Sequence, residues 1–163
     1  MIGYQPIGII YSPFKEPKGT PVQTTAAEGV SGSIELAFRY AAGLQDLEGF
    51  SHLLLIYHLH LAAAADSLLV TPFLDDEPHG IFATRSPARP NPIGLSVVRL
   101  GKINGRRLDI YDVDIIDGTP LLDIKPYVPL FDAKEPARIG WFEKNLHKLS
   151  DARDDGRFMQ VRK

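Results

Sequence analysis

The segment that decides the fold is Ile93-Gly-Leu-Ser-Val-Val-Arg-Leu-Gly-Lys-Ile-Asn-Gly-Arg-Arg-Leu-Asp-Ile-Tyr-Asp-Val-Asp-Ile-Ile116. Its two runs of apolar and β-branched residues, 93–103 and 108–116, flank Asn104–Gly105, and Asn-Gly strongly favours a two-residue hairpin turn. Three aspartates interrupt the second run, so its alternation is imperfect, which indicates a bulge or a face with a function. The segment therefore predicts a β-hairpin.

The rest of the chain adds short strands and few helices. Further strands are predicted at 2–12, 32–36, 51–61 and 121–124. Helical spacing of apolar residues predicts one short helix at Ala37–Leu47 and another at Pro136–Leu149. We therefore predict a mostly-β fold, a single-domain β-barrel with one or two short helices. The barrel would occupy residues 1–135, and residues 136–163 would add a C-terminal helix and a loosely held, charged tail to the same domain.

Composition is that of an ordinary globular protein of 163 residues, with 44% hydrophobic and 23% charged residues. There is no Cys, which excludes disulfides, thiolate metal sites and a thiol nucleophile and fits a cytoplasmic location. The longest apolar stretch, 53–65, is too short to span a bilayer. No leader is recognised, and no membrane partner is expected.

Charge is divided unevenly between the two halves of the chain. Residues 1–80 contain three basic and nine acidic side chains, whereas residues 81–163 contain fifteen basic and eleven acidic ones. A basic half can bind a phosphate backbone although the net charge is −2. Scatter of charge without a function is the alternative.

The segment Gly80–Leu95 is a stiff loop that contains two cations. Its three prolines fix the backbone, and Arg85 and Arg89 stand four residues apart within the loop. Each guanidinium is a fork of donors suited to a carboxylate or a phosphate. In the alternative interpretation, the arginines pair with carboxylates of the barrel and only brace the loop.

A second group of polar residues lies in the segment Asp117–Tyr127. On a strand, Asp123 and Lys125 point to the same face, and Tyr127 follows at the rim. An acid, an amine and a phenol can hold an amino acid or move a proton. A turn at the corner of a hairpin, followed by a structural Asp123–Lys125 ion pair, is the alternative.

Metal and dinucleotide sites are not expected. His58 and His60 share one face of a predicted strand, but no third ligand stands near them in the sequence, so we predict no metal. Neither a Gly-x-Gly-x-x-Gly motif nor a Gly-Lys-Ser/Thr loop is present, which argues against a Rossmann-type or P-loop site.

Two motifs carry a resemblance to a known family. Ala83-Thr-Arg-Ser-Pro-x-Arg-Pro-Asn-Pro-Ile-Gly94 and Asp117-Gly-Thr-Pro-x-x-Asp-Ile-Lys-Pro-Tyr127, together with 7–14 and 47–61, resemble the TrmO/TsaA-like family over about Tyr4 to Phe131. The resemblance implies a β-barrel enzyme that uses S-adenosyl-L-methionine and methylates N6 of N6-threonylcarbamoyladenosine beside the tRNA anticodon. It also implies a homodimer with the cofactor near the subunit boundary, and this chain is similar to the compact, single-domain members.

The resemblance also assigns residues. The cofactor positions that it implies are Pro21, Val22, Gln23, His60, Leu61, Arg85, Leu95, Asp117, Gly118, Thr119 and Pro120. Arg89 and Asn91 are the candidates for substrate binding, and Asp123, Lys125 and Tyr127 for catalysis. Family members often have Arg at position 22 and Gln at position 61, so side-chain contacts there would be lost.

Two other functions remain open from the sequence. One is a methyltransferase of the same fold that acts on a different substrate. The other is a regulator that binds S-adenosyl-L-methionine without catalysis.

Overall fold

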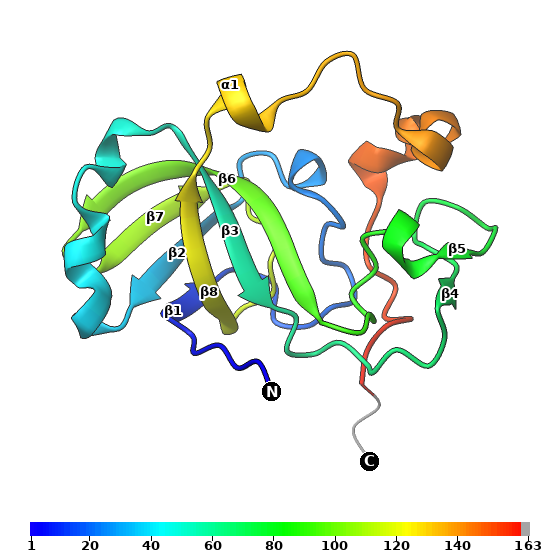
Figure 1. Ribbon diagram of the computed structural model, residues 1–163, viewed down its shortest axis with the longest axis horizontal. Coiled ribbons are helices and arrows are strands. Elements are labelled where there is room, and N and C mark those ends of the chain that lie inside the picture. Colours follow the sequence, from blue (N-terminus) through cyan, green and yellow to red (C-terminus); the bar gives the residue numbers. More distant parts are fainter. Residues whose placement is uncertain (161–163) are drawn as a thin grey trace.

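Six antiparallel strands close into a barrel in the computed structural model, which describes residues 1–160 (Figure 1). Their order around the barrel is β1-β2-β7-β6-β3-β8. The bounds are β1 Gly8–Tyr11, β2 Ser31–Leu36, β3 His52–His58, β6 Ile93–Asn104, β7 Arg107–Tyr111 and β8 Thr119–Pro126. A separate two-stranded sheet pairs β4, Leu69–Val70, with β5, His79–Gly80. The predicted mostly-β barrel is confirmed.

The β6–β7 hairpin forms as predicted, with its turn one residue later. Asn104 pairs with Arg107, so Gly105 and Arg106 are the central residues, and Gly105 has a φ of 60°. Strand β7 ends at Tyr111 because Asp112 adopts the left-handed conformation, with a φ of 65°. The strand predicted as far as residue 116 is therefore shorter, and the aspartates after it lie outside the ladder.

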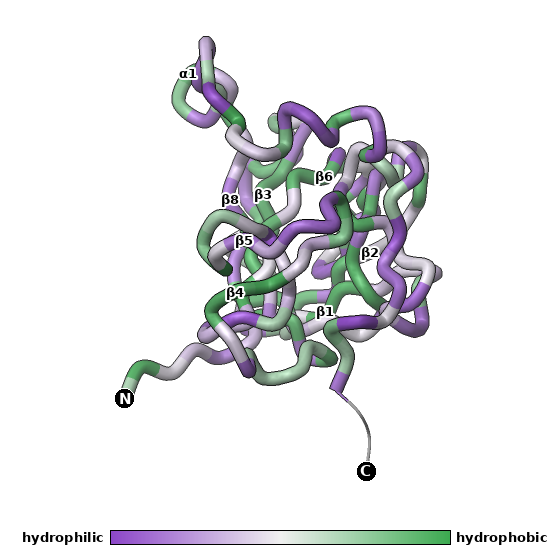
Figure 2. Tube along the Cα trace, turned by 90° about the vertical axis from the view of Figure 1, so that its right-hand side faces the viewer, coloured by the Kyte–Doolittle hydropathy of each residue, from purple (hydrophilic) through white to green (hydrophobic). Residues whose placement is uncertain are grey.

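Alternating residues of the strands fill the barrel. On β3, Leu53, Leu55 and Tyr57 are buried, while the residues between them are less so. This is the period of two expected of a strand with one face in the core. Figure 2 shows hydrophobic stretches along β2, β3 and β6. Full burial of each Leu contributes about 2 kcal/mol to folding.

Helical structure is limited to single turns. The predicted helix at 37–47 is the 3-10 turn η2, Phe38–Leu44, in which only Leu44 is buried. The helix predicted at 136–149 is split into η5, Gly140–Lys144, and η6, Leu146–Asp151, with no buried hydrophobic residue in either turn. Too little apolar surface is covered in these segments to stabilise a longer α-helix.

Four other short helical elements lie between the strands or after the last one. The four-residue helix α1, Pro129–Asp132, projects from the barrel in both views (Figures 1 and 2). The remaining 3-10 turns are η1 Thr24–Ala26, η3 Leu47–Gly49 and η4 Ile81–Ala83. Within residues 1–160, no helix combines the length and the apolar character needed to cross a membrane.

The C-terminal segment is held against the barrel, so the prediction of a loose tail is wrong as far as residue 160. We call residues 134–160 the strap; it runs down one side of the barrel (orange to red in Figure 1). Isolated bridges join Pro21 to Arg153 and Ala62 to Met159. Backbone pairing of this kind is independent of side-chain charge, which is why the charged composition did not indicate it. The final part of the predicted tail, 161–163, lies outside the described residues.

Candidate functional site

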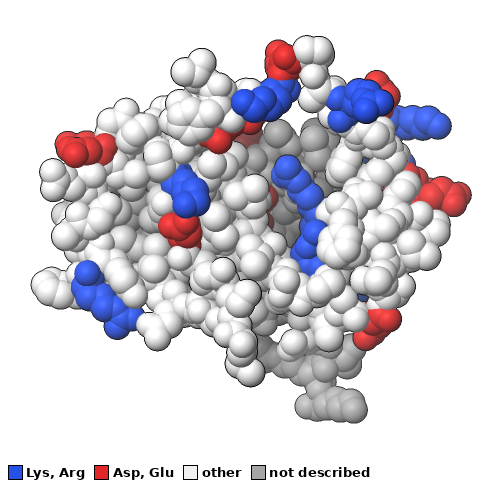
Figure 3. Space-filling view, in the orientation of Figure 1, with Lys and Arg blue, Asp and Glu red and all other residues white. Residues whose placement is uncertain are grey.

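A cavity of about 360 Å³ opens where β3 ends and β6 begins, between the barrel and the strap. Figure 3 shows a hollow on this face with basic side chains along it. Nine residues predicted as site residues from the sequence line this cavity. They are Pro21, Val22, Gln23, His60, Leu61, Arg85, Leu95, Thr119 and Arg89.

The two arginines of the proline-rich loop face the cavity without an acidic partner. Arg85 donates to Oε1 of Gln23 at 3.2 Å. Arg89 donates from Nη1 to the carbonyl oxygens of Thr84 and Ser86, at 3.0 and 3.1 Å. Among residues 1–160, neither guanidinium forms a salt bridge. The alternative in which barrel carboxylates neutralise them is therefore wrong for these residues, although Arg89 does brace its own loop.

A buried chain of three polar side chains also reaches the cavity. Ser96 Oγ donates to Asp114 Oδ1 at 2.7 Å and lies 2.9 Å from the hydroxyl of Tyr57. Because Ser96 uses its proton on Asp114, the Tyr57 hydroxyl donates to Ser96. Gly94 makes room for the phenol ring, since a Cβ at this position would lie 2.1 Å from Tyr57 Cε2.

Burial controls the ionisation of this chain. It raises the pKa of Asp114 to about 6, against the hydrogen bond from Ser96 and the charge of Arg85, which lower it. Burial also raises the pKa of Tyr57, and the charge of Asp114 adds to that shift. The sequence motifs do not single out this group: Asp114 is one of the three aspartates whose position indicates a bulge or a face with a function, and Ser96 and Tyr57 lie within predicted strands.

Two further polar groups of the cavity are available to a ligand. Ser86 Oγ is buried and has no hydrogen-bond partner among the described residues. The pKa of His60 is lowered by burial and by the neighbouring His58, which favours the neutral imidazole. Its Nδ1 lies 3.4 Å from Oγ1 of Thr119. An orphaned buried hydroxyl is costly, and its presence in a cavity wall suits a site whose ligand completes the bonding.

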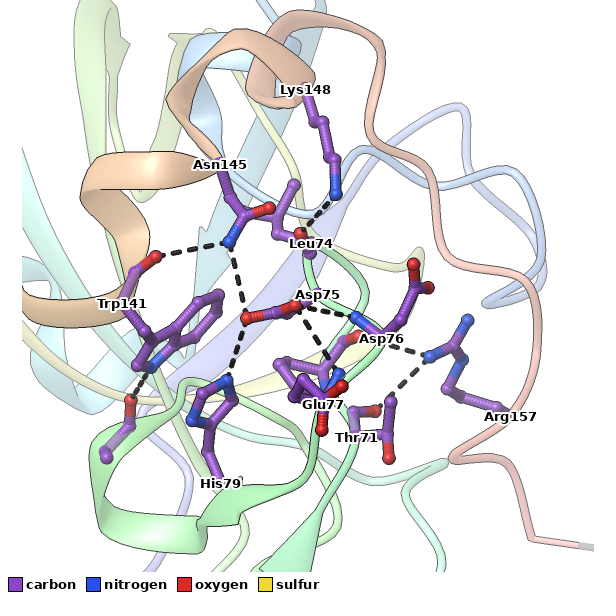
Figure 4. A network of polar contacts seen from close by, with 12 residues as sticks. Thr71, Leu74, Asp75, Asp76, Glu77, His79, Trp141, Asn145, Lys148 and Arg157 are labelled. Carbon is purple, nitrogen blue, oxygen red and sulfur yellow. Dashed lines mark hydrogen bonds and ion pairs between the residues drawn. The ribbon is translucent and has the colours of Figure 1, made fainter.

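The strap forms the opposite wall with Trp141, Phe142 and Asp154. Figure 4 shows how it is attached. Asp75 accepts hydrogen bonds from His79 Nε2 at 2.9 Å and from Asn145 Nδ2 at 3.3 Å. Trp141 stacks on the ring of His79 at a centroid distance of 4.6 Å and on Phe142 at 3.9 Å.

The indole N–H and two basic side chains extend this attachment. Trp141 Nε1 donates to the carbonyl of Ala83 at 2.8 Å. Lys148 donates to the carbonyl of Leu74, and Arg157 to that of Thr71 (Figure 4). No sequence pattern indicates this wall, because its anchors are side chains that lie far apart along the chain.

The predicted residues Asn91, Asp117, Gly118 and Pro120 do not line the cavity. The carboxylate of Asp117 is 2.7 Å from Lys15 Nζ and accepts the N–H of Ser12, and the hydrogen bond from Lys15 lowers its pKa. This acid holds the turn before β8 to the end of β1, as the turn interpretation expected.

Asp123, Lys125 and Tyr127 lie toward the other end of the β3–β8 ladder. Lys125 pairs across it with Leu54, whereas the cavity begins at Tyr57. Asp123 and Lys125 form an ion pair of 2.9 Å with both side chains well exposed. The ring of Tyr127 meets His52 edge to face. The structure therefore does not bring these three residues to the cavity of the same chain.

No metal site is found among residues 1–160. His58 and His60 are not joined there by a third Asp, Glu, His or Cys in an arrangement that could hold an ion.

Comparison with known proteins gives consistent results. Residues 9–133 match the model of the tRNA-methyltransferase O N-terminal domain. A probable S-adenosyl-L-methionine-binding protein of Pyrococcus abyssi is 61% identical over 99% of this chain and 87% of its own length. The tRNA (adenine(37)-N6)-methyltransferase of Escherichia coli is 36% identical over 80% of this chain and 59% of its own.

A solved structure agrees in fold. TrmO from Pseudomonas aeruginosa superposes with a TM-score of 0.72 at 40% identity, covering 86% of this chain and 62% of that one. The chain thus spans less than two thirds of the length of the Escherichia coli and Pseudomonas aeruginosa proteins. Because the family model matches more than half of the chain and the barrel is shared with the solved structure, this chain belongs to the family of the tRNA-methyltransferase O N-terminal domain.

Proposed function

We propose that this protein is an S-adenosyl-L-methionine-dependent methyltransferase that acts in the cytoplasm on tRNA. Its substrate is N6 of N6-threonylcarbamoyladenosine in the anticodon loop. One observation carries the proposal: eight of the eleven cofactor positions inferred from the sequence, which are scattered between residues 21 and 119, line a single cavity. The names of the family members support the same cofactor and reaction.

The cavity has groups for each part of the cofactor. S-adenosyl-L-methionine supplies an activated methyl group on a sulfonium, and it carries an ammonium, a carboxylate and an adenine. Arg85 suits the carboxylate, Asp154 suits the ammonium, and Phe142 offers an aromatic surface. The free Ser86 Oγ adds a hydrogen bond. Positions 22 and 61, where family members often have Arg and Gln, contribute only apolar side chains and backbone here.

The substrate part of the proposal depends on the loop arginines. Threonylcarbamoyladenosine differs from adenosine by an added carboxylate, and a planar carboxylate is best held by a guanidinium. Arg89 faces the cavity with no acidic partner among the described residues and uses only Nη1 on its own loop. Its other donors are therefore free for a ligand. Asn91, on the same loop but outside the cavity, stays a prediction as a substrate contact.

Methyl transfer to tRNA tests the proposal. Purified protein is incubated with labelled S-adenosyl-L-methionine and tRNA that contains threonylcarbamoyladenosine, and the digested nucleosides are separated. We expect the label on the N6-methylated form of that nucleoside. Label on another nucleoside would show a different substrate. Cofactor binding without transfer to any nucleoside would support the binding regulator instead.

Replacement of Arg89 by Lys tests substrate recognition. Lysine keeps the positive charge but lacks the planar guanidinium, which can donate two parallel hydrogen bonds to a carboxylate. We therefore expect the rate of methyl transfer to fall by about thirtyfold, or about 2 kcal/mol, while the affinity for the cofactor stays within a few-fold. If Arg89 only braces the loop, the melting temperature and the cofactor affinity fall together. Wild-type transfer by Arg89→Lys would exclude Arg89 as the recognition residue.

A homodimer is part of the proposal. The small β4–β5 sheet and the η4 turn that follows it leave apolar side chains uncovered: Leu69 is 63% and Phe82 is 79% exposed. Exposed apolar groups beside a site fit a contact between subunits. Light scattering at tens of micromolar should give twice the chain mass, and an active monomer would contradict this part.

A further inference from the structure

The cavity contains only two carboxylates among the described residues, and they differ in setting. Asp154 lies on the strap and accepts the N–H of Gly156. Asp114 lies on the barrel side, just beyond β7, in the buried chain with Ser96 and Tyr57. The role of Asp114 is not explained by the fold, since a buried acid without a basic partner does not stabilise the barrel.

We propose that Asp114 accepts the proton that the substrate nitrogen loses during methyl transfer, with Ser96 and Tyr57 positioning its carboxylate. The proposal rests on the proposed function and deepens it. It replaces none of the predicted cofactor contacts, because Asp114 is not among them.

The geometry leaves one oxygen of Asp114 free for this task. Oδ1 accepts the Ser96 hydroxyl at 2.7 Å, and Ser96 is in turn held by Tyr57. Oδ2 accepts no hydrogen bond from any other described residue, only the backbone N–H of Asp114 itself also acts on the carboxylate, and the side chain lines the cavity. A carboxylate fixed through one oxygen and free at the other has a defined direction, as an acceptor of a substrate proton requires.

The charges favour the same role. The substrate nitrogen forms a bond to the methyl carbon, the methyl–sulfur bond breaks, and its electrons return to sulfur as a neutral thioether. The proton on that nitrogen passes to Oδ2, and Asp114 becomes a neutral acid. The positive charge of the sulfonium and the negative charge of the carboxylate are thus neutralised in the same step. In a medium of low dielectric constant, this avoids leaving an unpaired buried charge.

The ionisation of Asp114 is suited to a base at neutral pH. With a pKa of about 6, the group is ionised at pH 7 and is still a stronger base than an exposed aspartate. The titratable and charged groups that share the cavity with it are Tyr57, His60, Arg85, Arg89 and Asp154, and of these the charge of Arg85 acts on its pKa. Because the base must be ionised, kcat/KM should rise with pH through the pKa of Asp114 and fall away below it.

His60 is a further proton acceptor of the cavity, besides its two carboxylates. Thr119 donates its hydroxyl to the carbonyl of Ile116 at 2.6 Å, so its Oγ1 accepts from Nδ1 of His60 and leaves Nε2 unprotonated. His60 is one of the positions inferred for the cofactor, however, and Asp114 is not. The pH profiles of variants distinguish the two groups.

The experiment compares Asp114→Asn with Asp109→Asn. Asparagine keeps the shape of the aspartate side chain, and its Oδ1 can still accept the hydrogen bond from Ser96. Asp109, on the same hairpin, is half exposed and paired with Arg107, far along the strand from the cavity. We expect Asp114→Asn to bind S-adenosyl-L-methionine within a few-fold of wild type and to lose methyl transfer by roughly a hundredfold or more. The remaining activity of this variant should no longer fall at low pH, a fall that we call the acid limb of the pH profile. Asp109→Asn should keep both the wild-type rate of methyl transfer and the acid limb.

Ser96→Ala tests positioning separately. The Ser96 hydrogen bond lowers the pKa of Asp114, so its removal should move the acid limb to higher pH as well as reduce kcat. A purely structural role of Ser96 would reduce stability and leave the limb in place.

Four results would overturn the proposal. They are wild-type transfer by Asp114→Asn, an unchanged acid limb in that variant, joint loss of cofactor binding and transfer, and loss of the limb in Asp123→Asn or His60→Gln instead. The third result would make Asp114 a cofactor ligand, and the fourth would move the acceptor to another group. If the wild-type protein transfers no methyl group at all, the proposed function fails first, and the two failures are thus distinguishable.

Discussion

The two walls of the cavity are held in different ways. The barrel wall belongs to continuous ladders, such as the seven pairs between His52–His58 and Ile93–Arg99, over a closed apolar core. The strap wall is joined to the barrel by isolated bridges and by side-chain hydrogen bonds such as those of Asp75, Asn145 and Trp141. Cooperative ladders resist local opening, whereas scattered polar contacts open at lower cost.

The family match divides the walls at the same place. The matched segment ends at residue 133, so Trp141, Phe142 and Asp154 lie beyond it and yet line the cavity. The Pyrococcus abyssi relative, by contrast, aligns over 99% of the chain. The groups proposed for the chemistry thus come from the shared barrel, and the strap adds closure and aromatic surface to them.

The largest effect is expected on the barrel wall, from Gly94→Ala. The new Cβ would lie 2.1 Å from Cε2 and 2.5 Å from Cζ of Tyr57, whose ring is buried and cannot move aside. We expect a loss of about 3 kcal/mol of unfolding free energy in a denaturant titration, at the upper end of overpacking effects.

Gly80→Ala is the matched control for this substitution. Gly80 has a φ of −57° and no atom within 4 Å of the added Cβ, so its replacement should be nearly neutral. Equal stability of the two variants would mean that the tight contact between Gly94 and Tyr57 does not constrain this wall.

An intermediate effect is expected on the strap wall, from Trp141→Ala. The substitution removes the stack on His79, the stack on Phe142 and the bond to Ala83. Calorimetry should show about a tenfold loss of S-adenosyl-L-methionine affinity, or about 1.4 kcal/mol, while the far-UV spectrum of the barrel stays unchanged.

Phe131→Ala is the control for the loss of an aromatic residue. Phe131 is 61% exposed on the projecting helix α1, outside the cavity. If both variants bind the cofactor as the wild type does, the strap is not part of the binding site.

The same contrast explains what the sequence could predict. Local patterns predicted the barrel, because alternation and an Asn-Gly turn act over a few residues, as in the β6–β7 hairpin. The family resemblance predicted nine of the residues that line the cavity on the barrel side, among them Arg85 and Thr119. Asp123 and Lys125 were correctly placed on one face, but the cavity lies at the other end of their ladder, which depends on the pairing register.

The strap and the buried chain could not be predicted in this way. The contact of Asp75 with Asn145 spans 70 residues, and that of Ser96 with Asp114 spans 18. Neither has a periodic pattern, and a buried carboxylate has the same letter in the sequence as an exposed one. The charged composition of residues 151–160 even favoured the wrong conclusion, since their pairing with the barrel is made by the backbone.

The smallest effect is expected from lowering the pH, which should destabilise the strap at a higher pH than it destabilises the barrel. The hydrogen bond from His79 lowers the pKa of Asp75 below its usual value of 3.8. The pair therefore contributes its stability above the unfolded pKa of aspartate and loses it as the pH falls through the lower, folded value. Asp155 in the strap behaves in the same sense, because Arg157 lowers its pKa.

The chain offers a direct probe of this order, since Trp141 is its only tryptophan and lies in the strap. In an acid titration, the Trp141 emission should change at a higher pH than the far-UV signal of the barrel strands. Asp75→Asn should flatten the early part of the emission change, because the titrating carboxylate is gone. Emission and far-UV signals that move together in both proteins would mean that strap and barrel form one cooperative unit, and that the two walls of the cavity do not differ in stability.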